Sequence, residues 1–127
     1  MTSRAILSAL GCLATIGFLT TGVLAHHGWT WTEEKQSEMT GKITKIYIGP
    51  PHPQIHIETA DGPWTVDFGN PNQTLAAGFV EGSAKVGDTV TILGNRSNRS
   101  GEKLMKAVRA TINGKAYTFY PERLPKP

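Results

Sequence analysis

The fold of this chain is decided by the stretch QIHIETADGPWTVDF, which spans residues 54–68. Its first half alternates strictly, with Ile55 and Ile57 on one side and polar residues on the other, as is typical of a half-buried β-strand. Its second half repeats the alternation from Trp64 to Phe68, and the intervening Asp61-Gly62 pair favours a tight turn. The stretch therefore predicts a β-hairpin with one apolar face turned towards a core.

The period of the sequence changes directly after this hairpin. Asn70 suits the N-cap of a helix, Pro71 suits the first helical position, and Gly78 suits the left-handed residue that ends a helix. These three signals predict one short helix between the hairpin and the rest of the chain.

Further short strands are expected on both sides of this unit. Before it, residues 39–48 predict a long strand that bends at Gly41. After it, the pattern predicts a strand that turns Val90 and Ile92 inwards and ends at Gly94-Asn95, a strand over residues 103–112, and a last strand over residues 117–120 behind an Asn113-Gly114 turn.

This order of elements predicts a mainly β protein, an OB-like five-stranded barrel with one short helix. The helix favours the barrel over an open β-sandwich, the alternative fold, because it can plug the open end of a small barrel. We expect a signal helix over residues 1–25, an N-terminal segment over 26–38, the barrel over 39–120 and a tail over 121–127. The polar residues 95–101 are interpreted as a solvated loop between two strands, although they contain two N-glycosylation triplets.

Residues 1–25 have the layout of an export signal. Arg4 forms a short positive region, an apolar run follows, and Val23 and Ala25 are the small residues three and one before a cleavage site. An uncleaved membrane anchor is the alternative, but serine, threonine and glycine residues dilute the apolar run. We therefore expect cleavage between Ala25 and His26, and a periplasmic or secreted protein.

Composition narrows the class of protein further. The single cysteine, Cys12, lies in the predicted signal, so no disulfide can reinforce the exported chain and a hydrophobic core must suffice. The net charge is +3, and the lysine and arginine residues are scattered rather than gathered in a stripe. A nucleic-acid partner is therefore not expected.

The four histidines carry the plausible metal chemistry. If the chain begins at His26, its free amine and its ring can chelate one metal ion, as in a histidine brace, which needs a second histidine from the fold. His27 offers a competing mode, in which the amine, its own amide nitrogen and its ring form the planar set that Cu(II) prefers. Both modes use the same amine and both therefore depend on cleavage.

His52 and His56 are the internal candidates. Prolines around His52 exclude a helix, and in a strand two residues four apart lie about 13 Å from each other, too far to share one ion. His52 is the better candidate because its proline turn fixes the backbone, whereas His56 lies on a polar strand face that suits a surface residue. We therefore expect at most one of them to join a given site.

The chain also resembles a known family through four short motifs in succession: Ala25-His26-His27, Pro51-His52, Pro71-Asn72 and Gly87-Asp88. This succession is similar to that of the small secreted bacterial proteins grouped as domain of unknown function 6152. The chain departs from that pattern at Pro50 and Gln54, where the family often has Asn and Trp, and at His56, where it often has an aromatic residue. The resemblance implies export, a small β fold and importance for His26, His27 and His52, but no reaction.

Two functions of different classes follow. The first is a periplasmic metal-binding protein, with copper as the expected metal and a periplasmic protein as a possible partner. The second is a metal-free binding module, whose barrel face with Tyr47, Trp31 and residues 95–101 would hold a saccharide, lipid or peptide. A copper-dependent oxidase is a third and weaker hypothesis, because a brace can activate oxygen but nothing identifies a substrate surface. No nucleophile with a positioned base is recognisable, and an enzyme is not expected. Membrane contact is expected only through an uncleaved signal.

Overall fold

The computed structural model of the protein describes residues 28–127. The predicted signal helix, His26 and His27 lie outside the described residues. The elements follow the order β1 (Ser37–Tyr47), β2 (Gln54–Thr59), β3 (Gly62–Asp67), α1 (Pro71–Ala76), β4 (Thr89–Arg96), β5 (Leu104–Ile112), β6 (Lys115–Thr118) and η2 (Pro121–Arg123).

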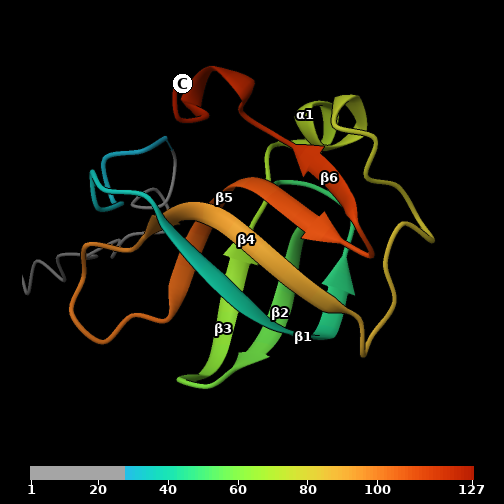
Figure 1. The fold of residues 1–127 in the computed structure, drawn as a ribbon, viewed down its shortest axis with the longest axis horizontal. Helices are drawn as coiled ribbons and strands as arrows, with labels where there is room; N and C mark the ends of the chain where they lie inside the picture. The colour runs from blue at the N-terminus through green and yellow to red at the C-terminus, as the bar shows by residue number, and fades with distance from the viewer. Residues whose placement is uncertain (1–27) are drawn as a thin grey trace, which may run out of the picture.

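The strands form a barrel (Figure 1). The sheet runs β3-β2-β1-β4-β5-β6, and a parallel pairing of β3 with β5 closes it. In that pairing Thr65 lies opposite Leu104 and Asp67 lies opposite Lys106, while β6 continues from β5 as a hairpin strand. The expected OB-like five-stranded barrel with one short helix is confirmed. The open sandwich is wrong, because the β3–β5 pairing joins the two edges that a sandwich would leave apart.

The 54–68 hairpin forms the centre of the core. Ile55, Ile57 and Val66 are fully buried, and Trp64 and Phe68 are nearly so. Burial of each such side chain stabilises the fold by about 1.5–3 kcal/mol. The strict alternation therefore identified the inward face correctly.

The helix α1 begins and ends where the sequence indicates. The Asn70 side chain accepts a hydrogen bond from the Gln73 amide, and the Gln73 side chain accepts one from the Asn70 amide, which completes a capping box. Gly78 has the expected positive φ of 85°. Figure 1 shows α1 at one end of the barrel, where the buried Phe79 that follows it packs edge-to-face on Phe68 at 5.0 Å.

The last hairpin confirms a turn and corrects a strand. Asn113 and Gly114 have φ values of 51° and 77°, as a type I′ turn requires. This two-residue turn places Lys115 opposite Ile112, so β6 begins two residues before the expected start.

The expected end of the fourth strand is wrong. Gly94 does not end β4, which continues to Arg96 and has an irregular register between Leu93 and Gly94. A Cβ atom at Gly94 would lie 2.2 Å from the Lys106 carbonyl oxygen. Glycine is therefore present for the close approach of β4 to β5, not as a strand terminator.

Residues 95–101 are also less solvated than expected. Asn95 and Ser97 are buried, and the Asn95 amide group donates a hydrogen bond of 2.9 Å to the Glu33 carbonyl oxygen. Ser97 forms an isolated bridge with Thr32. These contacts fix the N-terminal segment along the start of the loop, because a buried amide must find a hydrogen-bond partner.

Replacing Gly94 by Ala should therefore destabilise the protein by about 2 kcal/mol, because the added methyl group would overlap backbone atoms that cannot move independently. Urea unfolding followed by tryptophan fluorescence measures the change. Thr89→Ala, at an exposed position of the same strand, is the matched control and should change stability by less than about 0.5 kcal/mol. Equal stability of the Gly94→Ala and wild-type proteins would contradict the close-approach explanation.

Candidate functional site

His52 lies immediately before β2, at a fixed point of the barrel. The Pro53 carbonyl oxygen next to it accepts a hydrogen bond of 2.9 Å from the Phe68 amide, which continues the β2–β3 ladder past the end of both strands. His52 is half-buried and its Nε2 atom is inaccessible to solvent. The backbone position of this histidine is therefore set by the hairpin rather than by a free loop.

His56 occupies a different position, inside β2. It pairs with Lys45 of β1 and with Thr65 of β3. Its neighbours Ile55 and Ile57 are both fully buried. Because side chains alternate along a strand, His56 projects from the outer surface of the barrel. The structure thus places the two internal histidines in separate surroundings.

The first described residue of the chain, Gly28, is held at the barrel by Lys106. The Lys106 Nζ atom donates a hydrogen bond of 2.6 Å to the Gly28 carbonyl oxygen. This lysine lies in β5 and is only 6% exposed. His26 and His27 are outside the described residues, but His27 directly precedes Gly28 in the chain. The described part of the chain is therefore tethered at the residue that directly follows His27, a predicted ligand.

Strand pairing connects this tether to His52. Lys106 of β5 lies opposite Asp67 of β3, and Asp67 lies opposite Gln54 of β2. The Gln54 amide also donates a hydrogen bond of 3.0 Å to the Asp67 carboxylate. Lys106 and Gln54 are thus two strand spacings apart, about 10 Å. Lys106, which binds Gly28, and Gln54, which follows His52 by two residues, consequently lie near the same end of the barrel.

Aromatic rings and a second cation surround the contact between Lys106 and Gly28. The Lys106 ammonium lies 4.5 Å from the centre of the Trp29 ring, and the Arg123 guanidinium carbon lies 3.8 Å from the same centre. Trp29 also meets Tyr120 edge-to-face at 4.9 Å. Burial lowers the pKa of Lys106, an effect opposed by the Asp67 carboxylate and reinforced by Arg123, and burial raises the pKa of Tyr120.

The sequence analysis missed Lys106. A signal was present, because in the strand LMKAVRATI, residues 104–112, this lysine is the one polar residue of the first five. Its burial depends on contacts with residues far away in the chain, which a local pattern does not reveal.

The described residues form no metal centre of their own. Within residues 28–127 no group of three or more His, Cys, Asp or Glu side chains is placed to hold a metal ion. The brace predicted from the sequence would combine a histidine of this range with the amine and ring of His26, which lies outside it. Over the same range, no helix combines the length and apolar character needed to cross a membrane.

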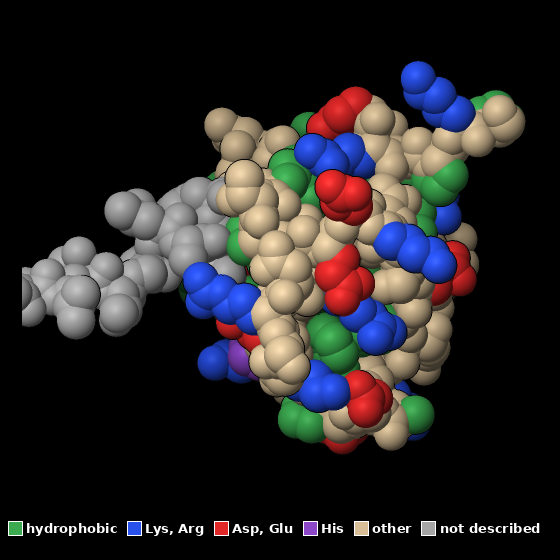
Figure 2. Space-filling view, turned by 90° about the vertical axis from the view of Figure 1, so that its left-hand side faces the viewer, with side chains coloured by type: hydrophobic (Ala, Val, Ile, Leu, Met, Phe, Trp, Pro, Cys, Tyr) green, Lys and Arg blue, Asp and Glu red, His purple; other side chains and the backbone are tan. Residues whose placement is uncertain are grey.

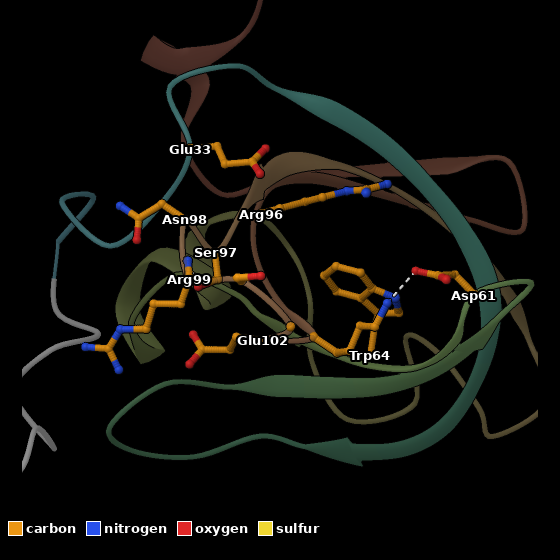
Figure 3. Close-up of a pocket in the computed structure, with 11 residues that line it drawn as sticks. Glu33, Asp61, Trp64, Arg96, Ser97, Asn98, Arg99 and Glu102 are labelled. Atoms are coloured by element: carbon orange, nitrogen blue, oxygen red, sulfur yellow. Dashed lines mark hydrogen bonds and ion pairs between the residues drawn. The ribbon is translucent and has the colours of Figure 1, made fainter.

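A separate hollow lies between the β2–β3 turn, the end of β4 and residues 97–103 (Figure 3). Its volume is about 280 Å³. Trp64 forms one wall, with the Arg96 guanidinium 5.3 Å and the Lys103 ammonium 5.1 Å from its ring centre. Lys103 also forms a 2.6 Å ion pair with Asp61, which lowers the pKa of that carboxyl group.

This side of the molecule does not present the aromatic platform that a saccharide would stack on. Trp64 is 6% exposed and Trp31 is 4% exposed. Figure 2, which looks onto this side, shows positively and negatively charged side chains intermingled rather than one large apolar patch. Tyr47 is the exposed aromatic residue of the predicted binding face, and its hydroxyl donates to the Pro50 carbonyl oxygen at 2.6 Å. The expectation that Trp31 lines an open ligand face is wrong, because the barrel buries it.

Comparison with solved structures finds similarity to part of much longer chains. The complex of TiaS with an isoleucine tRNA and ATP is similar with a TM-score of 0.49 and 19% identity. Apo TiaS, a tRNA agmatidine synthetase, and a tRNA fluorescent labelling enzyme give TM-scores of 0.47 at 17% and 18% identity. Each likeness covers 61% of this chain and 18% of the other.

Comparison with curated proteins finds no match. A family of unknown function, DUF6152, matches residues 15–106, a range that includes His26, His27, His52 and His56. The match spans most of the chain, and this protein therefore belongs to the DUF6152 family.

Proposed function

We propose that this protein is an exported periplasmic metal-binding protein and that its metal is copper. In this proposal signal cleavage exposes His26 as the first residue. The His26 amine and ring bind the ion together with the His52 ring, and His27 supplies the competing mode. Nitrogen donors in a planar arrangement suit the tetragonal preference of Cu(II).

One observation supports the proposal: Lys106, which binds the Gly28 carbonyl oxygen, lies two strands away from Gln54, the second residue after His52. Two residues of extended chain span about 7 Å, both from Gly28 to His26 and from Gln54 to His52. The strand spacing of about 10 Å between Lys106 and Gln54 is comparable with the reach of these segments. A brace between His26 and His52 is compatible with this arrangement.

The metal-free binding module is less well supported. Its predicted face depended on Trp31, which is buried, and the hollow beside Trp64 has its tryptophan covered by Arg96 and Lys103. We therefore favour metal binding, in transport or storage and without an enzymatic reaction, with a periplasmic protein as the partner that delivers or receives the ion.

The proposal is tested on protein exported by a bacterial host and purified from its periplasm. Intact-mass spectrometry should give a chain that begins at His26, and Cu(II) titration followed by calorimetry should show one equivalent bound. A mature chain that begins elsewhere, or a chain that begins at His26 and binds no copper, would refute the proposed function.

A further inference from the structure

The strongest unexplained feature of the barrel is its buried lysine. Lys106 is 6% exposed, and charged side chains are almost never buried to this extent unless they are paired. Its 2.6 Å hydrogen bond goes to a backbone carbonyl, that of Gly28. Lysine side chains usually extend so that the ammonium group stays in water, and this one does not. The fold therefore keeps a desolvated cation in direct contact with the first part of the exported chain.

Trp29, the residue after Gly28, is also held by several contacts. Two cations, Lys106 and Arg123, lie over its ring, and Tyr120 packs against the ring edge. The backbone of Arg123 is fixed in turn, because its carbonyl oxygen accepts a 2.7 Å hydrogen bond from the Gln36 side chain. The segment after β6, expected only as a tail, thus closes over the start of the exported chain.

We infer that Lys106, assisted by Arg123, is a positioning residue that clamps Gly28 and Trp29 so that the terminal histidine is held beside His52. This inference rests on the proposed function for its metal, but the clamp itself is a property of the metal-free protein. Neither side chain is proposed as a metal ligand. The clamp reduces the conformational freedom that the terminus would otherwise lose when it binds the ion.

The size of the effect follows from population arithmetic. If the anchored terminus falls to about a tenth of the molecules, the apparent copper affinity falls about tenfold. Lys106→Met retains most of the side-chain volume and removes both the charge and the donor, so the barrel should remain folded. Lys106→Arg retains a cation and donors and should recover affinity to within about threefold of the wild-type protein. Arg123→Ala should weaken binding by about threefold, because an exposed cation–π contact is worth less than the buried one.

The test combines a metal-free and a copper-loaded measurement on the mature protein. In the metal-free Lys106→Met protein, the NMR order parameter of the Trp29 amide should fall from about 0.85 to below about 0.6. Its Cu(II) affinity should fall about tenfold. Lys103→Met is the matched control, since Lys103 also lies over a tryptophan ring, that of Trp64, but contacts neither Gly28 nor Trp29 in the described structure.

The outcomes separate the clamp from the metal site. An unchanged order parameter in Lys106→Met would overturn the clamp. A reduced order parameter with unchanged affinity would overturn its role in positioning the metal ligand. If the wild-type protein binds no copper, the proposed function fails, while the order parameter still decides whether Lys106 holds the terminus.

Discussion

Extending the mature chain by Gly-Ser-Gly before His26 should weaken Cu(II) binding by about a hundredfold or more. The extension moves the free amine away from the His26 ring, so the two groups no longer bind the ion as one chelate. Separating linked donors typically forfeits a factor of about 10² to 10⁴ in affinity. Competition with a chelator of known copper affinity, followed by absorbance, measures the change.

The length of this extension is part of the design. A single added residue would place His27 third in the chain, where the amine, two amide nitrogens and the ring can form a new planar copper site. With three added residues neither His26 nor His27 stands at position two or three. Undiminished affinity in the extended protein would contradict an amine-based site. Zn(II) binding measured in parallel reports whether the loss is confined to copper.

Replacing His52 by Ala should weaken Cu(II) binding by about a hundredfold, because the fold then supplies no second histidine to the brace. The same titration at pH 7 measures this loss. His56→Ala is the matched control: it removes an imidazole from the same part of the chain, but from the outer surface of β2. The control should bind copper within about twofold of the wild-type protein.

The His52 result also distinguishes the two binding modes of the terminus. In the brace, His52 is indispensable. In the mode that uses the His27 amide and ring, His52→Ala would leave affinity unchanged and His27→Ala would abolish it. Intact binding by His52→Ala protein with loss in His27→Ala protein would therefore reject the brace and retain the terminal amine.

The elements that the sequence predicted well are those specified by neighbouring residues. The 54–68 hairpin follows from strict alternation, and α1 follows from the capping residues Asn70 and Gly78. The Asn113-Gly114 turn likewise follows from the backbone conformation that those two residues tolerate. Each of these signals is complete within a few residues, so no distant contact was needed to interpret it.

The features that the sequence did not predict depend on distant contacts. The local sequence indicates a strand end at Gly94, but glycine is required there because β4 approaches the Lys106 carbonyl. The sequence placed Trp31 on an open binding face near a polar loop, yet the barrel buries this residue. The closeness of Lys106 to Gln54 depends on the parallel pairing of β3 with β5, whose paired residues lie about forty positions apart.

The central claim is that the mature terminus and His52 bind the same copper ion. A crystal structure of the mature protein with one equivalent of Cu(II), with anomalous data at the copper edge, tests it most directly. The account predicts one copper peak about 2 Å from the His26 amine, a His26 ring nitrogen and a His52 ring nitrogen. A copper peak held without His52, or one held without the His26 amine, would contradict it.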